Sequence, residues 1–235
     1  MLYTIHEFES LPSTNTYVKE NAAVFSHGDV IVAKTQTNGR GRLDRKWISA
    51  QGGLYFTLFL RPPSKIFMAT MTQLLCLAIC RAIEGTGVSA GVKWPNDILV
   101  GNAKIAGIFG ETVRDESGEV GLALGAGVNL NQETVKVAGR KTTTLAREGV
   151  VALEVKFLDV ILRHFFAKYD RVVAEGFPLI QKEYFNKLIL LGHNVCVDTG
   201  LETLSGTFLR VNSAGHLVLG LPDTSVREIS IGDVK

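Results

Sequence analysis

The segment KIAGIFGETVRDESGEVGLALGAGVNL, residues 104–130, predicts two strands joined by a turn. Its two flanks, Lys104 to Val113 and Val120 to Leu130, are apolar and suited to a buried sheet. Between them, Asp115-Glu116-Ser117-Gly118 is typical of a turn, because these residue types supply local hydrogen bonds or a positive φ. A hairpin of this kind indicates an antiparallel sheet.

Strands and helices are mixed on both sides of this hairpin. Further strands are predicted at Leu2–Phe8, Val30–Gln36 and Gly53–Arg61, the last stopped by Pro62-Pro63. Helices are predicted after the N-cap residues Ser13-Thr14-Asn15, at Met68–Glu84, and in two amphipathic stretches, Leu158–Val173 and Phe177–Leu188. The first helix is expected to extend to Gly28, because Val18, Ala22 and Phe25 share one face. This mixture predicts an α+β fold with a mixed, mainly antiparallel sheet.

From about Leu191 the chain changes character. NVCVDTG, ETLSGTFLRV, GHLVLGLP and VREISIGDV are four short strand candidates separated by glycine, asparagine and aspartate. Such a tail predicts a small β-barrel. Because it is too short to enclose much of a core, it is expected to pack on the main domain. We therefore divide the chain into residues 1–188 and 189–235.

The composition narrows the classes of function. The 235 residues are 46% hydrophobic, which allows a packed core, and a net charge of +2 gives no support to general nucleic-acid or membrane binding. Cys76, Cys80 and Cys196 form no metal-binding pattern, and the first two are expected to be buried thiols. No signal peptide and no run of about 18 apolar residues is present, so a cytoplasmic location is expected.

The segment TQTNGRGRLDRKW, residues 35–47, carries a local excess of positive charge. Arginine offers a planar fork of donors that fits carboxylate and phosphate oxygens, and the glycines beside Arg40 let backbone approach an anion. Trp47 adds an aromatic face suited to stacking on a base. The residues alone leave two interpretations open, a clamp for an anion and a solvated surface loop.

Polar residues at two other places could also form a site. Pro95 interrupts KWPNDILV and leaves Asn96 and Asp97 at a corner, either as a simple Asx turn or as contacts for a metal or polar ligand. Lys104, among Ile, Ala and Gly, points into a cavity or to solvent. GxxxxGK[ST] and GxSxG are absent, and Gly125-Ala126-Gly127 lacks the third glycine of a dinucleotide fingerprint.

Five motifs occur in one order along the chain. They are Ser13-Thr14-Asn15; Gln36 with Gly39-Arg40-Gly41-Arg42 and Arg45-Lys46-Trp47; Lys93-Trp94-Pro95-Asn96-Asp97; Lys104-Ile105-Ala106-Gly107; and Gly125-Ala126-Gly127-Val128-Asn129. Together they resemble the motifs of biotin protein ligases, also called biotin–[biotin carboxyl carrier protein] ligases. The C-terminal segment resembles the small SH3-like domain of that family.

The resemblance implies a fold and a reaction. Residues 1–188 would form a catalytic domain similar to those of class II aminoacyl-tRNA synthetases and biotin ligases, and residues 189–235 an SH3-like β-barrel. The biotin carboxylate would attack the α-phosphorus of ATP, with Mg²⁺, to give biotinyl-5′-AMP and pyrophosphate. A lysine of a biotin carboxyl carrier protein would then take the biotin and release AMP. Family members are often homodimers.

The resemblance also implies roles for individual residues. Lys104, Arg40 and Arg42 would be catalytic, because they offset the repulsion between two anions. Biotin would contact Ser13, Thr14, Asn15, Gln36, Gly39, Arg40, Arg42, Lys104, Gly107 and Gly125. ATP and the adenylate would contact Arg42, Trp47, Asn96, Asp97, Lys104, Gly107, Ile108 and Asn129, with Asp97 also a Mg²⁺ contact. The loop at residues 39–47 would close over the intermediate and exclude water.

The sequence departs from the family pattern in two places. Some members carry an N-terminal helix-turn-helix domain and repress biotin synthesis, but here Ser13 already belongs to the first motif. We therefore expect no such domain and no DNA binding. Leu43-Asp44 interrupts the loop, and Asp44 is expected to face solvent, the alternative being a pair with an arginine.

Two other functions stay open from the sequence. Lipoate ligases and octanoyltransferases share the fold type, and KIAG resembles their lysine-plus-glycine element. However, the run of arginines before a triple glycine that marks lipoate ligases is missing, and no cysteine lies in a nucleophile motif. The other alternative is a non-catalytic sensor of biotin or nucleotide, against which the retained Lys104 and loop arginines argue.

Overall fold

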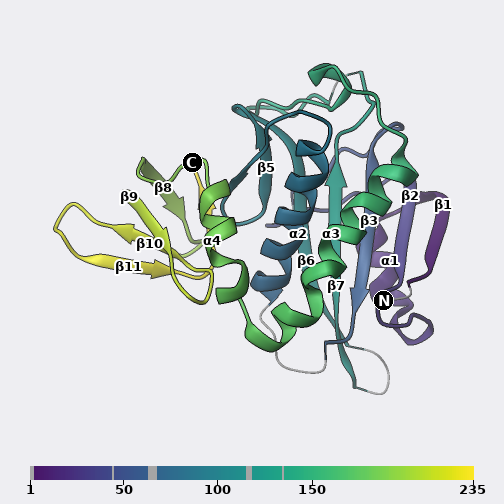
Figure 1. Cartoon of the computed structure of the whole chain (residues 1–235), viewed down its shortest axis with the longest axis horizontal. Coiled ribbons are helices and arrows are strands. Elements are labelled where there is room, and N and C mark those ends of the chain that lie inside the picture. The colour runs from purple at the N-terminus through teal and green to yellow at the C-terminus, as the bar shows by residue number, and fades with distance from the viewer. Residues whose placement is uncertain (1–2, 44, 63–67, 115–117, 134) are drawn as a thin grey trace.

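A computed structural model describes residues 3–43, 45–62, 68–114, 118–133 and 135–235. It contains a seven-stranded sheet packed against helices and a separate five-stranded sheet near the C-terminus (Figure 1). The strands of the large sheet are β1 (Ile5–Leu11), β2 (Val30–Gln36), β3 (Leu54–Leu60), β4 (Gly91–Lys93), β5 (Asp97–Val100), β6 (Ala103–Arg114) and β7 (Val120–Val128). Their order is β1-β2-β3-β7-β6-β5-β4.

The hairpin of β6 and β7 lies inside the large sheet, between β3 and β5. Its strands pair in antiparallel fashion from Ala106↔Val128 to Arg114↔Val120, which confirms the two strands expected from the sequence. Among the described strands of this sheet, β1 and β2 are the one parallel pair, so the sheet is mixed and mainly antiparallel, as predicted. Residues 115–117 of the expected turn lie outside the described residues, and Gly118 has a φ of +84°.

The large sheet is covered on both faces. Strand β3 is buried along its whole length, and its side chains alternate between two cores. Leu54, Phe56, Leu58 and Leu60 join the core formed with α2 (Met68–Glu84) and α3 (Glu154–Glu175). Phe59 points to the other face, where it packs with Val18 of α1 (Thr14–Glu20). This second core holds α1 against the sheet.

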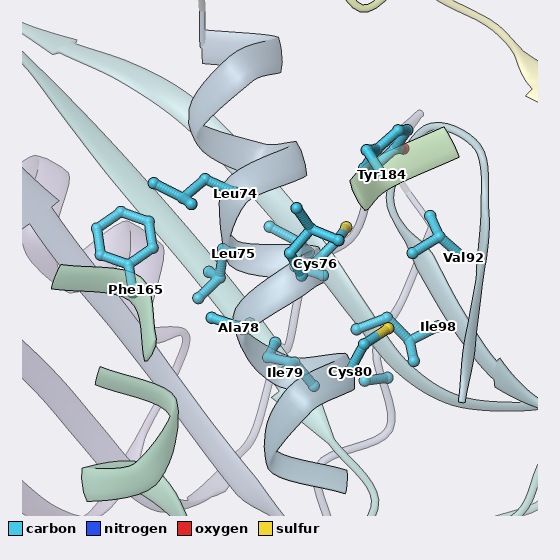
Figure 2. Close-up of a cluster of buried hydrophobic side chains, with 14 of the residues drawn as sticks. Leu74, Leu75, Cys76, Ala78, Ile79, Cys80, Val92, Ile98, Phe165 and Tyr184 are labelled. Carbon is cyan, nitrogen blue, oxygen red and sulfur yellow. The ribbon is translucent and has the colours of Figure 1, made fainter. Parts of the chain in front are cut away.

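Helix α2 is the centre of the larger core. Figure 2 shows its Leu74 and Leu75 beside Phe165 of α3, and its Cys76 and Cys80 on the side of Tyr184 in α4 (Pro178–Lys187). Burial raises the pKa of the Cys80 thiol to about 12, so it is not a reactive thiolate near neutral pH. The expectation that Cys76 and Cys80 are buried thiols is confirmed.

Two elements near the N-terminus differ from the prediction. The first strand begins at Ile5 and ends at Leu11, three residues beyond the expected end, because it pairs with β2 as far as Leu11↔Gln36. The first helix ends at Glu20, and a short 3-10 helix, η1 (Ala22–Val24), follows it. Asn21 ends α1, since both its backbone and side-chain N–H groups donate to the carbonyl of Tyr17.

The second sheet contains β8 (Asn194–Asp198), β9 (Thr203–Val211), β10 (Leu217–Gly220), β11 (Val226–Ile229) and β12 (Asp233–Val234), in the order β11-β10-β9-β8-β12. It is antiparallel throughout, and the last predicted strand is divided into β11 and β12. Phe208 and Leu217 belong to the same core as α2, so this sheet packs on the main domain as expected. The division between residues 188 and 189 stays a prediction. Among the described helices, none could span a membrane.

Candidate functional site

A cavity on the α1 side of the large sheet gathers the motifs that are distant in sequence. Its walls come from the start of α1, the end of β2, residues 40–42 and 45–48 of the loop, strands β5, β6 and β7, Asn129, residues of the segment 135–142, and Asp233. The predicted site residues that line it are Ser13, Thr14, Asn15, Gln36, Arg40, Arg42, Trp47, Asn96, Asp97, Lys104, Gly107, Ile108, Gly125 and Asn129. Gly39 lies outside the lining, at the neck of the loop, where its carbonyl accepts from the Trp47 N–H at 2.9 Å.

One end of the cavity is neutral and polar. Gln36 Oε1 accepts from the backbone N–H of Thr14 at 2.8 Å and from its hydroxyl at 3.2 Å. Gln36 Nε2 in turn donates to Ser49 Oγ at 2.8 Å, which fixes the orientation of the amide. Ser13 is the N-cap of α1, so its hydroxyl lies at the same end. These groups can donate and accept hydrogen bonds without adding charge.

Asn15 connects the neutral end to the sheet behind it. Its Oδ1 accepts from Thr57 Oγ1 at 2.6 Å, and its Nδ2 donates to the Phe109 carbonyl at 2.9 Å and to Glu111 Oε2 at 3.1 Å. A Cβ on Gly125 would lie 2.1 Å from Asn15 Oδ1. Gly125 therefore makes room for Asn15, a role that the sequence did not indicate.

The arginine loop is partly packed against the protein: Arg40, Arg42 and Trp47 are partly buried, whereas Leu43, Arg45 and Lys46 are exposed. Arg40 Nη1 lies 3.3 Å from both carboxylate oxygens of Glu111, and its guanidinium lies 5.6 Å from the centre of the Phe109 ring. Gly41 N–H donates to the Arg45 carbonyl at 2.7 Å, which closes the loop. Asp44, expected to face solvent, lies outside the described residues.

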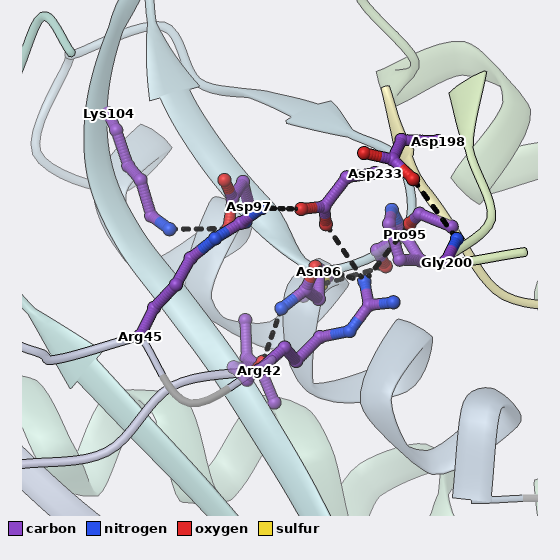
Figure 3. A network of polar contacts seen from close by, with 12 residues as sticks. Arg42, Arg45, Pro95, Asn96, Asp97, Lys104, Asp198, Gly200 and Asp233 are labelled. Carbon is purple, nitrogen blue, oxygen red and sulfur yellow. Dashed lines mark hydrogen bonds and ion pairs between the residues drawn. The ribbon is translucent and has the colours of Figure 1, made fainter. Parts of the chain in front are cut away.

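Arg42 and Arg45 reach the second sheet, as Figure 3 shows. Arg42 Nη1 donates to Asn96 Oδ1 at 3.1 Å and to the Gly232 carbonyl at 3.3 Å, and it lies 3.7 Å from Asp233 Oδ1. Arg45 forms an ion pair with the other oxygen of Asp233. Desolvation lowers the pKa of Arg42, although Asp233 and Asp97 oppose this, and an arginine stays charged after such a shift.

Lys104 is paired with the aspartate of the KWPND motif. Its Nζ lies 2.5 Å from Asp97 Oδ1 (Figure 3). The same Nζ lies 5.1 Å from the centre of the Trp47 ring. The Asn96 side chain accepts a hydrogen bond from Arg42 through Oδ1, and its Nδ2 donates one to the Ile108 carbonyl at 2.6 Å. Because both partners are distant in sequence, Asn96 is part of the cavity wall and not a simple Asx turn.

Trp47 lies in a recess made by two glycines. A Cβ on Gly127 would come within 2.3 Å of Trp47 Nε1, and one on Gly107 within 3.1 Å of the ring. The indole Nε1 and Asn129 Oδ1 are buried and have no hydrogen-bond partner among the described residues. Buried polar atoms are rarely left unpaired, so both atoms have unused capacity toward a ligand in the cavity.

The sequence did not single out two carboxylates: Asp233, which lines the cavity, and Glu111, which contacts the cavity residues Asn15 and Arg40. Burial alone would raise the pKa of Glu111, but hydrogen bonds from Lys19 and Asn15 and the charge of Arg40 bring it below the usual value. The only feature of the sequence that could have indicated Glu111 is that an acidic residue stands in a mostly apolar strand. Asp233 carries no local signal, because its role depends on the packing of one sheet beside the other.

The residues fit a Mg²⁺ ion that arrives with a nucleotide. Mg²⁺ is usually held by one or two carboxylates together with substrate phosphates. Asp97, which lines the charged end of the cavity, would supply such a carboxylate. No group of three or more histidine, cysteine or acidic side chains within the described ranges could hold a metal by itself.

The sequence matches the model of the biotin/lipoate A/B protein ligase family over residues 7–129. This match covers more than half of the chain, so the chain belongs to that family. Similar proteins include a biotin–[acetyl-CoA-carboxylase] ligase of Paracoccus denitrificans, 29% identical over 221 residues, which are 89% of this chain and 91% of that protein.

Another relative is the bifunctional ligase/repressor BirA of Bacillus spizizenii, which is 28% identical over 88% of this chain. The chain spans 66% of the length of this relative and 66% of the Bacillus subtilis one. Among solved structures, the biotin protein ligase of Aquifex aeolicus in complex with biotin and ATP is similar. Its TM-score is 0.88 at 27% identity, over 99% of this chain and 97% of that one.

Proposed function

We propose that this chain is a biotin protein ligase. It would activate biotin with ATP to biotinyl-5′-AMP and transfer the biotin to a lysine of a biotin carboxyl carrier protein. The observation that carries the proposal is the division of one cavity into a neutral hydrogen-bonding end and a cationic end. Biotin has the same division, with an uncharged ureido head and a carboxylate tail.

At the neutral end, Ser13, Thr14 and Gln36 would bind the ureido group. Their donors and acceptors are already oriented by hydrogen bonds within the protein, so little ordering is left for the ligand to cause. The carboxylate would then lie toward Arg40 and Lys104, which offset its repulsion from the α-phosphate.

The first step forms one bond and breaks another at phosphorus. A biotin carboxylate oxygen bonds to the α-phosphorus, the bond from the α-phosphorus to the bridging oxygen breaks, and the electron pair leaves with pyrophosphate. Arg42 and Lys104 would stabilise the charge that develops at the α-phosphate. Mg²⁺, held through Asp97, would supply further positive charge there.

The adenylate would be held beside Trp47. Trp47 and Asn129 line this part of the cavity, and Trp47 Nε1 and Asn129 Oδ1 have no hydrogen-bond partner among the described residues. The loop at residues 39–47, several of whose described residues line this part of the cavity, would cover the mixed anhydride and exclude water from it. In the second step the neutral lysine amine would attack the carbonyl carbon, the bond to the AMP oxygen would break so that AMP leaves with the electron pair, and the amine would lose a proton to solvent.

The finer assignments belong to the same proposal. The acceptor would be the carrier domain of a biotin-dependent carboxylase, the enzyme would act with Mg²⁺ in the cytoplasm where ATP is available, and two copies would form a homodimer. Residues 1–188 would carry the cavity and residues 189–235 would contribute Asp233 to it.

The alternative that lipoate or octanoate is the substrate is disfavoured by the neutral end. The apolar acyl chains of these molecules would make no hydrogen bonds with the polar groups at this end, whereas the ureido head of biotin would.

Exchange of labelled pyrophosphate into ATP tests the proposal. We expect exchange that depends on biotin and not on lipoate or octanoate. Exchange that requires lipoate would overturn the choice of substrate. Binding of biotin and ATP with no exchange would identify a non-catalytic sensor instead.

A further inference from the structure

Thr57 is a polar residue behind the neutral end of the cavity that the proposed reaction leaves without a role. It lies in the middle of β3, paired with Ile31 of β2 and Gly125 of β7, and it is fully buried. Its hydroxyl contacts residues at the start of α1, but Thr57 does not line the cavity. Valine would fill nearly the same space without a polar atom, so burial alone does not account for the hydroxyl.

The orientation of the Asn15 amide determines where the Thr57 proton lies. Asn15 Nδ2 donates to the Phe109 carbonyl at 2.9 Å and to Glu111 Oε2 at 3.1 Å. Both partners can only accept, because the lowered pKa of Glu111 keeps its carboxylate ionised near neutral pH. Asn15 Oδ1 therefore points to Thr57 Oγ1, 2.6 Å away, and needs a donor there. Since a hydroxyl carries one proton, Thr57 gives its proton to Asn15.

The Thr14 hydroxyl is left with lone pairs toward the cavity. It lies 2.8 Å from Thr57 Oγ1 and 3.2 Å from Gln36 Oε1. Thr57 has no second proton to give, and Gln36 Oε1 is an amide oxygen that already accepts from the Thr14 backbone N–H. The single hydroxyl proton of Thr14 is therefore used within the protein, whichever of the two oxygens receives it. What Thr14 offers a ligand is an acceptor.

Ser13, next to Thr14, offers the opposite polarity. Its Oγ accepts from the Thr16 backbone N–H at 3.4 Å, and no described residue accepts a hydrogen bond from it. Its proton is thus available to a ligand. A donor and an acceptor on neighbouring residues match the C=O and N–H groups of a cyclic urea. The lone pairs of Thr14 would repel a ligand that placed an oxygen or sulfur atom there instead.

We propose that Thr57 is a positioning residue that sets the direction of the hydrogen bonds at the neutral end, so that Thr14 meets an N–H group of the ligand as an acceptor. This inference rests on the proposed ligase function. Thr57 touches no substrate and acts through Thr14 and Asn15. A site built to bind a ligand N–H disfavours a ring without one, so a residue of β3 contributes to the choice of substrate.

Removing the Thr57 hydroxyl changes two contacts at once. Asn15 Oδ1 loses its donor, and the Thr14 proton loses the nearer of its two acceptors. Thr14 can then turn its proton toward the cavity, where it opposes the ligand N–H. The ureido ring takes no part in the bond changes at phosphorus, so bound biotin and the transition state lose the same binding energy. KM for biotin should therefore rise while kcat stays constant.

Thr57→Val tests the inference, with Thr57→Ser as the conservative variant and Thr70→Val as the control. Thr70 is a buried threonine of α2 that lines no part of the cavity. In pyrophosphate exchange, Thr57→Val should raise KM for biotin about tenfold and leave kcat and KM for ATP within about twofold. Thr57→Ser and Thr70→Val should keep KM for biotin within about threefold of the unaltered protein.

These variants separate positioning from a structural role. A fall in kcat with constant KM, or no recovery in Thr57→Ser, would overturn the inference. Thr57→Ala removes the same hydroxyl and takes the place of the valine variant if urea unfolding shows that the latter does not fold.

A double-mutant cycle with Thr14→Val shows whether Thr57 acts through Thr14. Calorimetry should give an about tenfold loss of biotin affinity for Thr57→Val alone, but a further loss below about threefold in the Thr14→Val background. Equal losses in both backgrounds would overturn the inference and leave the ligase function standing. If the unaltered protein neither binds biotin nor shows exchange, the ligase function fails, and the inference fails with it.

Discussion

At the scale of single residues, two glycines of β7 make room for side chains at different ends of the site. Gly125 and Gly127 are two positions apart, so they face the same side of the strand. Gly125 makes room for Asn15 at the neutral end, and Gly127 makes room for Trp47 at the adenylate end. Each glycine thus serves a different half of the proposed substrate pair.

Replacing each glycine by alanine should affect the two substrates differently. A Cβ at Gly125 displaces Asn15, so Gly125→Ala should raise KM for biotin about tenfold, which equals about 1.4 kcal/mol, and leave KM for ATP nearly unchanged. Gly127→Ala displaces Trp47 and should do the reverse. Pyrophosphate exchange at varied biotin and ATP measures both constants, and equal effects of the two variants would contradict this division.

The single residues that could be predicted from the sequence are those whose type already suggests chemistry. Arg40, Arg42 and Lys104 stand in motifs, and the structure brings them to one cavity. Glu111 and Asp233 could not be predicted, because an acid beside a site looks the same in sequence as an acid in solvent. Only the fold places them opposite the arginines.

At the scale of elements, Glu111 of β6 joins three parts of the chain. It binds Lys19 of α1 at 2.9 Å, Asn15 at the start of α1, and Arg40 of the loop. Its side chain is 13% exposed, so these contacts are only partly screened by solvent. The carboxylate therefore holds both the helix and the loop to the sheet.

Glu111→Gln should make stability less dependent on pH. The folded pKa of Glu111 lies below its unfolded value, 4.5, so its stabilisation is complete above that pH and is lost as pH falls through the folded pKa. At pH 7 the variant should lose roughly 1–2 kcal/mol of unfolding free energy. Urea unfolding at pH 7 and at pH 3.5 measures the difference in unfolding free energy between the variant and the unaltered protein, which should be smaller at pH 3.5. An equal difference at both pH values would show that the charge of Glu111 is not responsible.

Helices and strands with a strong local sequence pattern were predicted well. Those whose bounds depend on pairing or packing with other elements were not. Helix α2 and the strands β6 and β7 lie where the apolar runs place them. The first strand was predicted three residues too early, because its register depends on parallel pairing with β2, which leaves no trace in its own sequence. The spacing of Val18, Ala22 and Phe25 predicts one helix, but α1 ends at Glu20, with Asn21 as its C-cap.

At the scale of the whole molecule, the loop and the second sheet are joined at Asp233. This residue begins β12 and pairs with Arg42 and Arg45, so the small sheet forms part of the wall of the cavity. Gly215, in the turn between β9 and β10, accepts hydrogen bonds from Gln73 of α2 and from Trp94. The second sheet is therefore attached to the main domain both at Asp233 and at Gly215.

Weakening either attachment of the loop should release the intermediate. Asp233→Asn removes the charge that holds Arg42 and Arg45, and Arg40→Gly removes the contact with Glu111. An ion pair of about 1 kcal/mol corresponds to about a fivefold change in release rate. We expect both variants to biotinylate lysines of an unrelated protein such as serum albumin. Strict selectivity for the carrier would show that the loop does not retain the adenylate.

The position of Trp47 in its recess should make the intrinsic fluorescence of the protein sensitive to ligand binding. The chain has two tryptophans, and Trp94 is 2% exposed with its Nε1 donating to the Gly215 carbonyl at 3.1 Å, so its surroundings should stay constant. Trp47 borders the cavity and keeps an unpaired N–H. Filling the cavity should therefore change the intrinsic fluorescence of one indole only. Emission that follows biotin and ATP in the unaltered chain and not in Trp47→Phe would give a label-free titration of each substrate.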